Sequence, residues 1–124
     1  MKMPCEVVVW QVLPMVRREL AGELVSSHGM TQSEVARRFG VTDAAVSQYL
    51  TRKRGGDYSD SPLYPRFIDA VRDAASRIAR GADAGAEICR LCGVVGGIGL
   101  LDEIYSRTTG ASLPSCDAAA VARR

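Results

Sequence analysis

The sequence predicts an all-α protein organised around two short helices joined by a tight turn. Its 124 residues are 47% hydrophobic but only 6% aromatic, and alanine, valine, leucine and isoleucine dominate, which favours helices. A pair of short, capped helices separated by a glycine is predicted within residues 30–54. We therefore expect residues 1–55 to form the DNA-binding domain with its N-terminal lead, residues 56–64 a linker, and residues 65–124 a helical segment for dimerisation and metal binding.

Residues 1–11 form a short lead, which we expect to be extended or to form a turn that lays Trp10 onto the core. The first helix is expected to begin near Leu13. Pro14 then falls in its first turn, where a missing amide hydrogen costs no helical hydrogen bond. The apolar residues of this helix recur at helical spacing and define its buried face: Leu13, Val16, Leu20, Leu24 and Val25.

The polar residues of the first helix are expected to lie at the surface. Arg17 and Arg18 should face solvent or phosphate. His28 stands at the C-terminal end, where a cation interacts favourably with the helix dipole, and Gly29 ends the helix.

The helix-turn-helix is predicted from capping residues and a central glycine. Thr31 can cap the first helix of the pair, and Glu34 three residues later completes a capping box. Ala36 is small where the two helices approach each other, and Gly40 supplies the turn because it adopts positive φ without steric cost. Thr42 can cap the second helix.

The second helix of the pair has one packing face and one outward face. Val46 and Tyr49 are expected to pack, which leaves a set of mostly small polar residues outward: Thr42, Asp43, Ala44, Ser47, Gln48 and Thr51. Such a face suits a helix in the DNA major groove, with Gln48 the best candidate for a bidentate contact to adenine. We expect Gln32 to contact phosphate, and the basic end of the helix to hold the DNA backbone: Arg52, Lys53 and Arg54. A purely structural helical hairpin is the alternative.

Residues 55–65 are rich in glycine, serine, aspartate and proline, and are expected to form a loop or wing. A helix is predicted at residues 65–80, with its apolar residues on one face: Phe67, Ile68, Val71, Ala75 and Ile78. This face either forms the dimer contact or covers the first part of the chain.

After residue 80, short helices are predicted to alternate with irregular stretches. A helix is expected at residues 83–91, after which the glycines of residues 93–99 are expected to break regularity and to allow close backbone approach to a partner or a cluster. A short helix should follow at residues 100–107. Residues 108–114 are expected to be a loop, and residues 115–124 an alanine-rich tail.

The charges are distributed unevenly. Residues 12–54 hold seven Arg or Lys against four Asp or Glu, whereas residues 55–124 hold eight against nine. The positive excess thus lies on the predicted DNA-binding half, as phosphate contact requires. Because this excess is small, we expect affinity to depend on dimerisation as well.

No apolar run resembles a signal peptide or a membrane span. The runs at residues 7–10 and 94–101 are too short for either. We therefore expect a cytoplasmic protein that does not contact a membrane.

The four cysteines, Cys5, Cys89, Cys92 and Cys116, are expected to be thiols or metal ligands in a reducing compartment. Cys89 and Cys92 form a C-x-x-C pair at the expected end of a helix, where two thiolates can hold one metal centre. One such pair with scattered single cysteines favours an iron–sulfur cluster, with 4Fe–4S preferred. Zinc, a redox-switching disulfide and plain packed thiols stay open as alternatives.

These motifs together resemble archaeal-type helix-turn-helix transcription regulators, whose DNA-binding unit is of the Cro and phage-repressor type and is followed by a C-x-x-C. The resemblance covers residues 4–55 and resumes at residues 88–92. It is carried by the motifs P-C-E, W-x-x-L-P-x-x-R and T-Q-x-x-x-A-x-x-x-G-V-T-x-A-A-V-S-Q-Y-L-x-x-K-R-G, together with the C-x-x-C. It implies a homodimeric DNA-binding regulator in which Cys5 joins Cys89 and Cys92, as in a cluster-binding sensor.

The resulting expectation is a homodimeric transcription regulator, and not an enzyme, that binds a palindromic site on double-stranded DNA. Its two recognition helices should lie roughly 34 Å apart. A cluster on Cys5, Cys89, Cys92 and Cys116 would report redox or iron–sulfur status. The rival expectation is a protein-interaction module, antitoxin-like or adaptor-like, that uses the hairpin only as a scaffold and carries structural zinc or free thiols.

Overall fold

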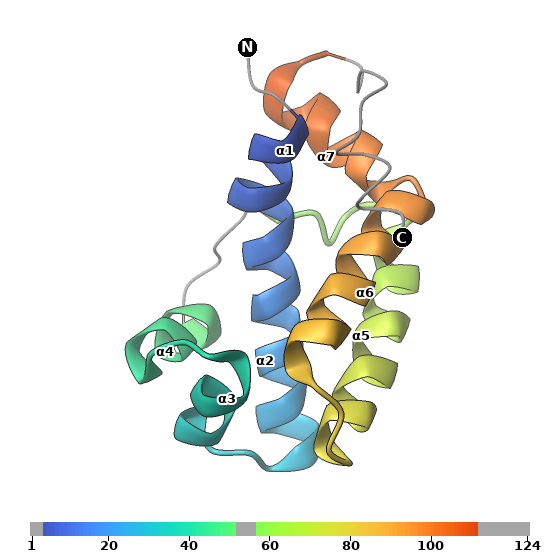
Figure 1. The fold of residues 1–124 in the computed structure, drawn as a ribbon. Helices are drawn as coiled ribbons and strands as arrows, with labels where there is room; N and C mark the ends of the chain where they lie inside the picture. Colours follow the sequence, from blue (N-terminus) through green and yellow to red (C-terminus); the bar gives the residue numbers. More distant parts are fainter. Residues whose placement is uncertain (1–3, 52–56, 112–124) are drawn as a thin grey trace.

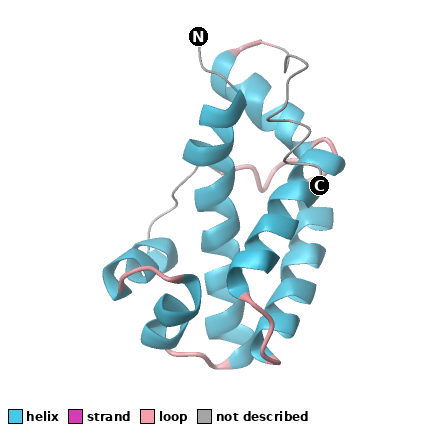
Figure 2. Ribbon diagram, in the orientation of Figure 1, coloured by secondary structure: helices cyan, strands magenta, loops and turns pink. Residues whose placement is uncertain are grey.

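A computed structural model describes residues 4–51 and 57–111, and all regular elements in these ranges are helical (Figure 2). The predicted all-α class is therefore confirmed. The elements are α1 (Pro4–Val7), the π-helical turn η1 (Val8–Val12), α2 (Leu13–His28), α3 (Gln32–Phe39), α4 (Asp43–Thr51), α5 (Tyr64–Ala79), α6 (Ala84–Gly97) and α7 (Leu100–Thr109).

The helices are arranged around α2 (Figure 1). α1, η1 and α2 follow one another as a long helix, with α5 and α6 on one side and the α3–α4 pair on the other. α7 lies across the end of the bundle near α1. Buried residues from all of these helices form one hydrophobic cluster, so the two segments predicted on either side of residues 56–64 share a single core.

The described part of the N-terminal lead, residues 4–11, is helical, which corrects the expectation of an extended lead or a turn. The helix begins at Pro4, and the Leu13 amide donates to the Val8 carbonyl across five residues. The π-type turn precedes Pro14, which cannot donate to the preceding turn, and this accommodates the proline inside a longer helix. It also buries Val7 and Val12, five residues apart, whereas Trp10 is 65% exposed and does not cover the core.

Arg18 is buried, which corrects the expectation that it faces solvent or phosphate. Its side chain is 9% exposed, and its Nη2 donates to the Tyr64 hydroxyl at 3.4 Å. Its Nε lies 3.7 Å from Glu19. The reason is that α5 packs along α2 on the side from which Arg18 projects. The predicted apolar face of α2 is otherwise found in the core, with Val16, Leu20 and Leu24 fully buried and Leu13 and Val25 partly buried.

The apolar face of α5 is used within the chain. Phe67, Val71, Ala75 and Ile78 are buried in the common core, and α5 packs on both α2 and α6. Of the two roles left open for this face, covering the first part of the chain is the one observed. A dimer contact through the same side chains would require α5 to leave the core.

Helix α6 is longer than predicted, and the glycine-rich stretch belongs to it. The helix starts after Asp83, whose carboxylate accepts from the Ala86 amide at 2.8 Å, and it continues to Gly97. Gly93 and Gly96 are buried within it. The break comes at Gly99, which has φ of +90°. Each glycine disfavours a helix by about 1 kcal/mol, so packing of α6 on α2, α5 and α7 outweighs this local preference.

Residues 57–63 are anchored to α7. Tyr58 and Ser61 are buried, and the Ser61 hydroxyl donates to Glu103 at 2.7 Å. Arg107 of α7 pairs with Asp60 at 2.8 Å. The described part of the predicted loop or wing is therefore held against the protein.

A buried carboxylate joins α5 to α6 and gives a first prediction. Glu87 is 4% exposed, and its Oε1 accepts from Arg77 Nε at 3.0 Å and lies 2.9 Å from Nη2. The Glu87→Ala substitution should lower the free energy of unfolding by about 2 kcal/mol, because charge-assisted hydrogen bonds are lost and Arg77 keeps its charge. Urea denaturation measures the change.

The matched control is Asp69→Ala on α5. Asp69 is exposed and lies 3.9 Å from Arg72, which is also exposed. This substitution should change the free energy of unfolding by no more than about 0.5 kcal/mol. Equal effects of the two substitutions would show that the Arg77–Glu87 pair does not hold the helices together.

Candidate nucleic-acid interface

The α3–α4 pair is built by the capping residues that the sequence indicated. The Thr31 hydroxyl accepts from the Glu34 amide at 3.1 Å, and Gly40 ends α3 with φ of +69°. The Val41 amide then donates to the Ala36 carbonyl at 3.0 Å, which closes the helix end as in a Schellman motif. The Thr42 hydroxyl accepts from the Ala45 amide at 3.1 Å and opens α4.

The contact between the two helices is apolar and tight. Ala36 is buried on α3, and Val46 and Tyr49 are buried on α4, which packs on both α3 and α2. A larger residue at position 36 would meet α4. The inward face of α4 is thereby fixed, and its opposite face must point away from the bundle.

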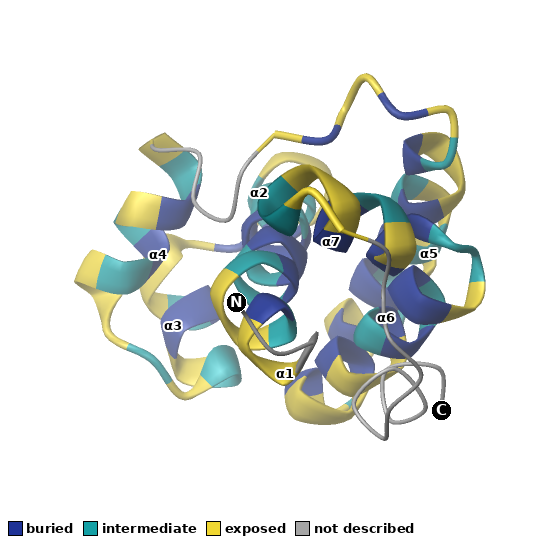
Figure 3. Cartoon of the chain, turned by 90° about the horizontal axis from the view of Figure 1, so that it is seen from above, coloured by how far each residue is buried: buried dark blue, intermediate teal, exposed yellow. Residues whose placement is uncertain are grey.

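That opposite face carries the residues predicted to contact bases. Ala44, Gln48 and Thr51 are exposed at positions that share one side of a helix, and Ser47 beside them is partly buried. Figure 3 shows α4 at the edge of the bundle with its outer surface exposed. The Thr51 hydroxyl donates to the Ser47 carbonyl at 2.7 Å. Its hydrogen is thus used within α4, and its oxygen can still accept a hydrogen bond.

The start of α4 is tied to the start of α3. Asp43 is exposed, and its Oδ2 accepts from the Ser33 hydroxyl at 2.7 Å. This bond links the first turns of the two helices. Thr42 and Gln32 are exposed at the same end. Arg52, Lys53 and Arg54 lie outside the described residues.

Two arginines of α3 have roles that the sequence analysis did not assign. Arg37 is exposed one turn after Ser33, on the outward side of α3. Arg38 turns the other way, and its Nη1 donates to the Ile78 carbonyl at the end of α5 at 2.9 Å. The inward positions of Val35 and Ala36 were the available signal, because successive residues of a helix are rotated by about 100° and Arg37 therefore lies almost opposite the direction midway between those two side chains.

The cysteines do not form a ligand set within the described part of the chain. Cys5 and Cys89 are exposed and Cys92 is partly buried, and no three His, Cys, Asp or Glu side chains in residues 4–51 and 57–111 could hold a metal ion together. Cys89 and Cys92 lie within α6 and not at its end, which corrects that expectation. Cys116 lies outside the described residues. The described residues alone do not fit an iron–sulfur or zinc site, and a cluster stays a prediction that iron and sulfide analysis of anaerobically purified protein would test.

Cys92 faces α2 near Arg17. Burial, and to a lesser extent the nearby Cys89, raise the pKa of the Cys92 thiol to about 11, against the opposing effect of the positive charge of Arg17. Arg17 Nε is itself buried without a hydrogen-bond partner among the described residues. Cys92 is therefore a protonated, packed thiol at neutral pH in the metal-free protein.

Comparison with known protein families, with characterised proteins and with solved structures yields no match. No single helix in the described ranges has both the length and the apolar character to cross a membrane. Only α6 and α7 taken together have the required length and apolar character, and a bend of 77° separates these two helices.

The thiol environment gives a second prediction, on metal-free reduced protein treated with iodoacetamide near neutral pH. Cys5 and Cys89 should be alkylated before Cys92, because both are exposed and the raised pKa leaves little thiolate at Cys92. Raising the pH toward about 11 should speed the reaction of Cys92 as its thiolate fraction grows. Peptide mass spectrometry follows each site, and equal rates for Cys89 and Cys92 near neutral pH would contradict this assignment.

Proposed function

We propose that this protein is a sequence-specific DNA-binding regulator of transcription, with α4 as its recognition helix. The observation that carries the proposal is the α3–α4 pair itself. Its buried contact through Ala36, Val46 and Tyr49 leaves an outward face of small polar residues at the edge of the bundle. A helix with such a face fits the DNA major groove, where side-chain amides and hydroxyls read base edges.

Gln48 is the proposed specificity residue. It is exposed in the middle of the outward face. Its side-chain amide can donate to N7 of adenine while its carbonyl oxygen accepts from the N6 amino group, which makes a bidentate contact. Ser47 and Thr51 flank it with hydroxyl groups. Asp43 has a positioning role in this proposal, since its bond to Ser33 links the first turns of α3 and α4.

Phosphate contacts are proposed at α3. Gln32 is exposed in its first turn, where backbone amides point outward, and Arg37 is exposed on the same helix. The basic residues Arg52, Lys53 and Arg54 extend this set as predicted from the sequence.

The small net charge of +2 supports a dimeric mode of binding. One copy offers few phosphate contacts, so two copies on a palindromic site would supply the affinity that one lacks. The α5 face is buried within the chain, and the proposed dimer therefore uses another surface.

The test starts with duplexes selected from a random pool by the purified protein. Gln48→Ala should lower discrimination between the selected site and a site with altered adenines by about 1–3 kcal/mol, because the bidentate contact is lost. Fluorescence anisotropy on both duplexes measures it. The control is Ser106→Ala, an exposed residue on α7 at the far end of the bundle. An equal loss of affinity on both duplexes would argue against base reading by Gln48.

A second pair of variants tests the phosphate contact. Arg37→Ala should weaken binding to all duplexes alike and reduce the slope of affinity against salt by about one. Arg72→Ala removes an arginine that is also exposed, on α5, and should leave the slope unchanged. Absence of DNA binding by the wild-type protein even at low salt would overturn the proposed function and favour a protein-interaction module.

A further inference from the structure

The exposed large apolar side chains of the described residues lie together on η1. Val9 is 54% exposed and Trp10 is 65% exposed, and every other large hydrophobic side chain in residues 4–51 and 57–111 is buried or partly buried. Apolar side chains that are exposed singly and far apart are ordinary in proteins. Two that are adjacent on one turn, with a tryptophan among them, mark an interaction surface.

The π-type turn presents these side chains. It directs Val7 and Val12 into the core, so the two residues halfway between them fall on the opposite side of the helix. Leu13 and Pro14, about one turn later, are partly exposed and extend the apolar surface into the start of α2. Figure 1 shows this end of the long helix clear of the α3–α4 pair. Val9, Trp10, Leu13 and Pro14 are together called the η1 surface.

The η1 surface is self-complementary in an antiparallel pair. A two-fold axis near residues 11 and 12 brings Trp10 of one copy onto Leu13 of the other. The same axis brings Val9 onto Pro14, and each contact is made twice, as an isologous interface requires. We propose that two copies of this chain dimerise in this way through the η1 surface.

The size of the surface fits a second copy as its partner. A stable interface buries about 800 Å² on each partner. A tryptophan side chain can bury about 150–250 Å². Val9 and Trp10 therefore suffice for the apolar centre of such an interface, and their polar neighbours supply its rim. An apolar centre of this modest size predicts a dimer that dissociates on dilution.

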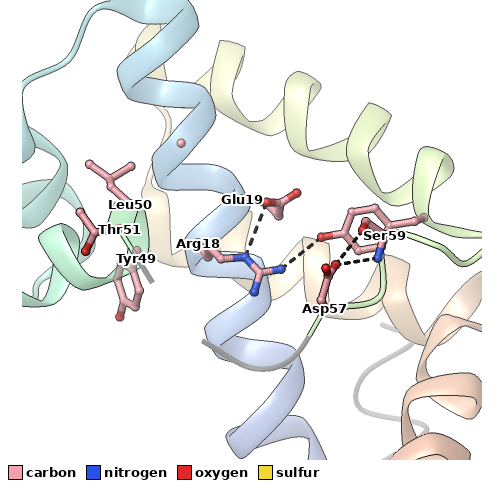
Figure 4. A pocket seen from close by; sticks show the side chains of 9 residues that line it. Arg18, Glu19, Tyr49, Leu50, Thr51, Asp57 and Ser59 are labelled. Carbon is pink, nitrogen blue, oxygen red and sulfur yellow. Dashed lines mark hydrogen bonds and ion pairs between the residues drawn. The ribbon is translucent and has the colours of Figure 1, made fainter. Parts of the chain in front are cut away.

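A cleft beside α4 shows where that helix lies on α2. The cleft has a volume of about 390 Å³, and Gly22 of α2 and the last turn of α4 line the same space (Figure 4). Its charged groups are matched within the chain. Arg18 contacts Glu19 and Tyr64, and Asp57 accepts from the amide and hydroxyl of the residue two positions later. The cleft therefore locates α4, and the open surface of the molecule is on η1.

The proposed axis also sets the spacing of the two recognition helices, a step that rests on the proposed function. Gly22 lies about ten residues beyond the axis, or about 16 Å at a helical rise of about 1.5 Å per residue. The two copies of α4 would then lie about 32 Å apart along the direction of α2, near the roughly 34 Å between half-sites on one side of DNA. A two-fold axis also keeps both copies of α4 at the same level along it, so both can reach one face of the duplex.

Trp10 is the single tryptophan of the chain, so its fluorescence reports on the proposed contact directly. In a dilution series of the full chain without DNA, its emission should move to shorter wavelength as the concentration rises, because the indole leaves water. Sedimentation equilibrium on the same samples should show the mass rising from 13.3 kDa toward twice that value. The two curves should have the same midpoint.

Val9→Glu keeps the fluorescent probe and places a charge in the contact. It should weaken dimerisation by roughly tenfold or more, because the carboxylate would have to be buried without a partner. The matched control is Ala86→Glu, which adds the same charge at an exposed position in the first turn of α6, where an acidic residue is favourable. It should change dimer affinity by less than about threefold. Unfolding temperatures close to the wild-type value would show that both variants fold.

Three results would overturn the inference: the protein stays monomeric at every concentration, the emission of Trp10 does not follow the mass, or Val9→Glu dimerises as the wild type does. An emission change that appears only with added DNA or lipid vesicles would assign the η1 surface to that partner instead. The DNA titration is separate. DNA binding while Trp10 stays exposed removes the dimer surface and leaves the proposed function standing. Dimerisation through Trp10 without DNA binding removes the proposed function and keeps the surface.

Discussion

Burial of α2 is the constraint on which the rest of the described structure depends. η1, α3, α4, α5 and α6 all pack on it, and Met15, Val16, Leu20 and Leu24 are fully removed from solvent. Each such side chain stabilises the fold by about 1.5–3 kcal/mol. No single partner helix covers α2, so its polar residues are also drawn into contacts, as Arg18 is with Tyr64. The position of the α3–α4 pair follows from the same packing.

The sequence predicted best those features that arise within a few residues. The caps at Thr31 and Thr42 and the turn at Gly40 depend on neighbouring atoms, and the structure contains them. The helical start at Pro4 and the passage of α6 through its glycines depend on burial by distant helices, and local preference pointed the other way. The same is true of Arg18, whose burial requires α5.

The candidate sites and the cleft beside α4 also differ in how far the sequence could predict them. The outward face of α4 could be derived from helical periodicity, because one helix carries it. The cleft lined by Arg18, Tyr49 and Tyr64 could not be derived in this way. Its walls come from α2, α4, residues 57–59 and α5, and nothing in the spacing of these three residues indicates that they meet. The outward position of Arg37 follows from helical periodicity once Val35 and Ala36 are known to face inward.

The bond from Arg38 to the Ile78 carbonyl ties the α3–α4 pair to the end of α5. Arg77, the preceding residue, holds Glu87, so adjacent positions at the end of α5 fasten both α3 and α6. A fragment cut after residue 55 would lose the acceptor for Arg38 together with the apolar cover of α2. The α3–α4 pair is thus not structurally independent of the rest of the chain. A graft of this pair onto another scaffold would need the end of α5 as well.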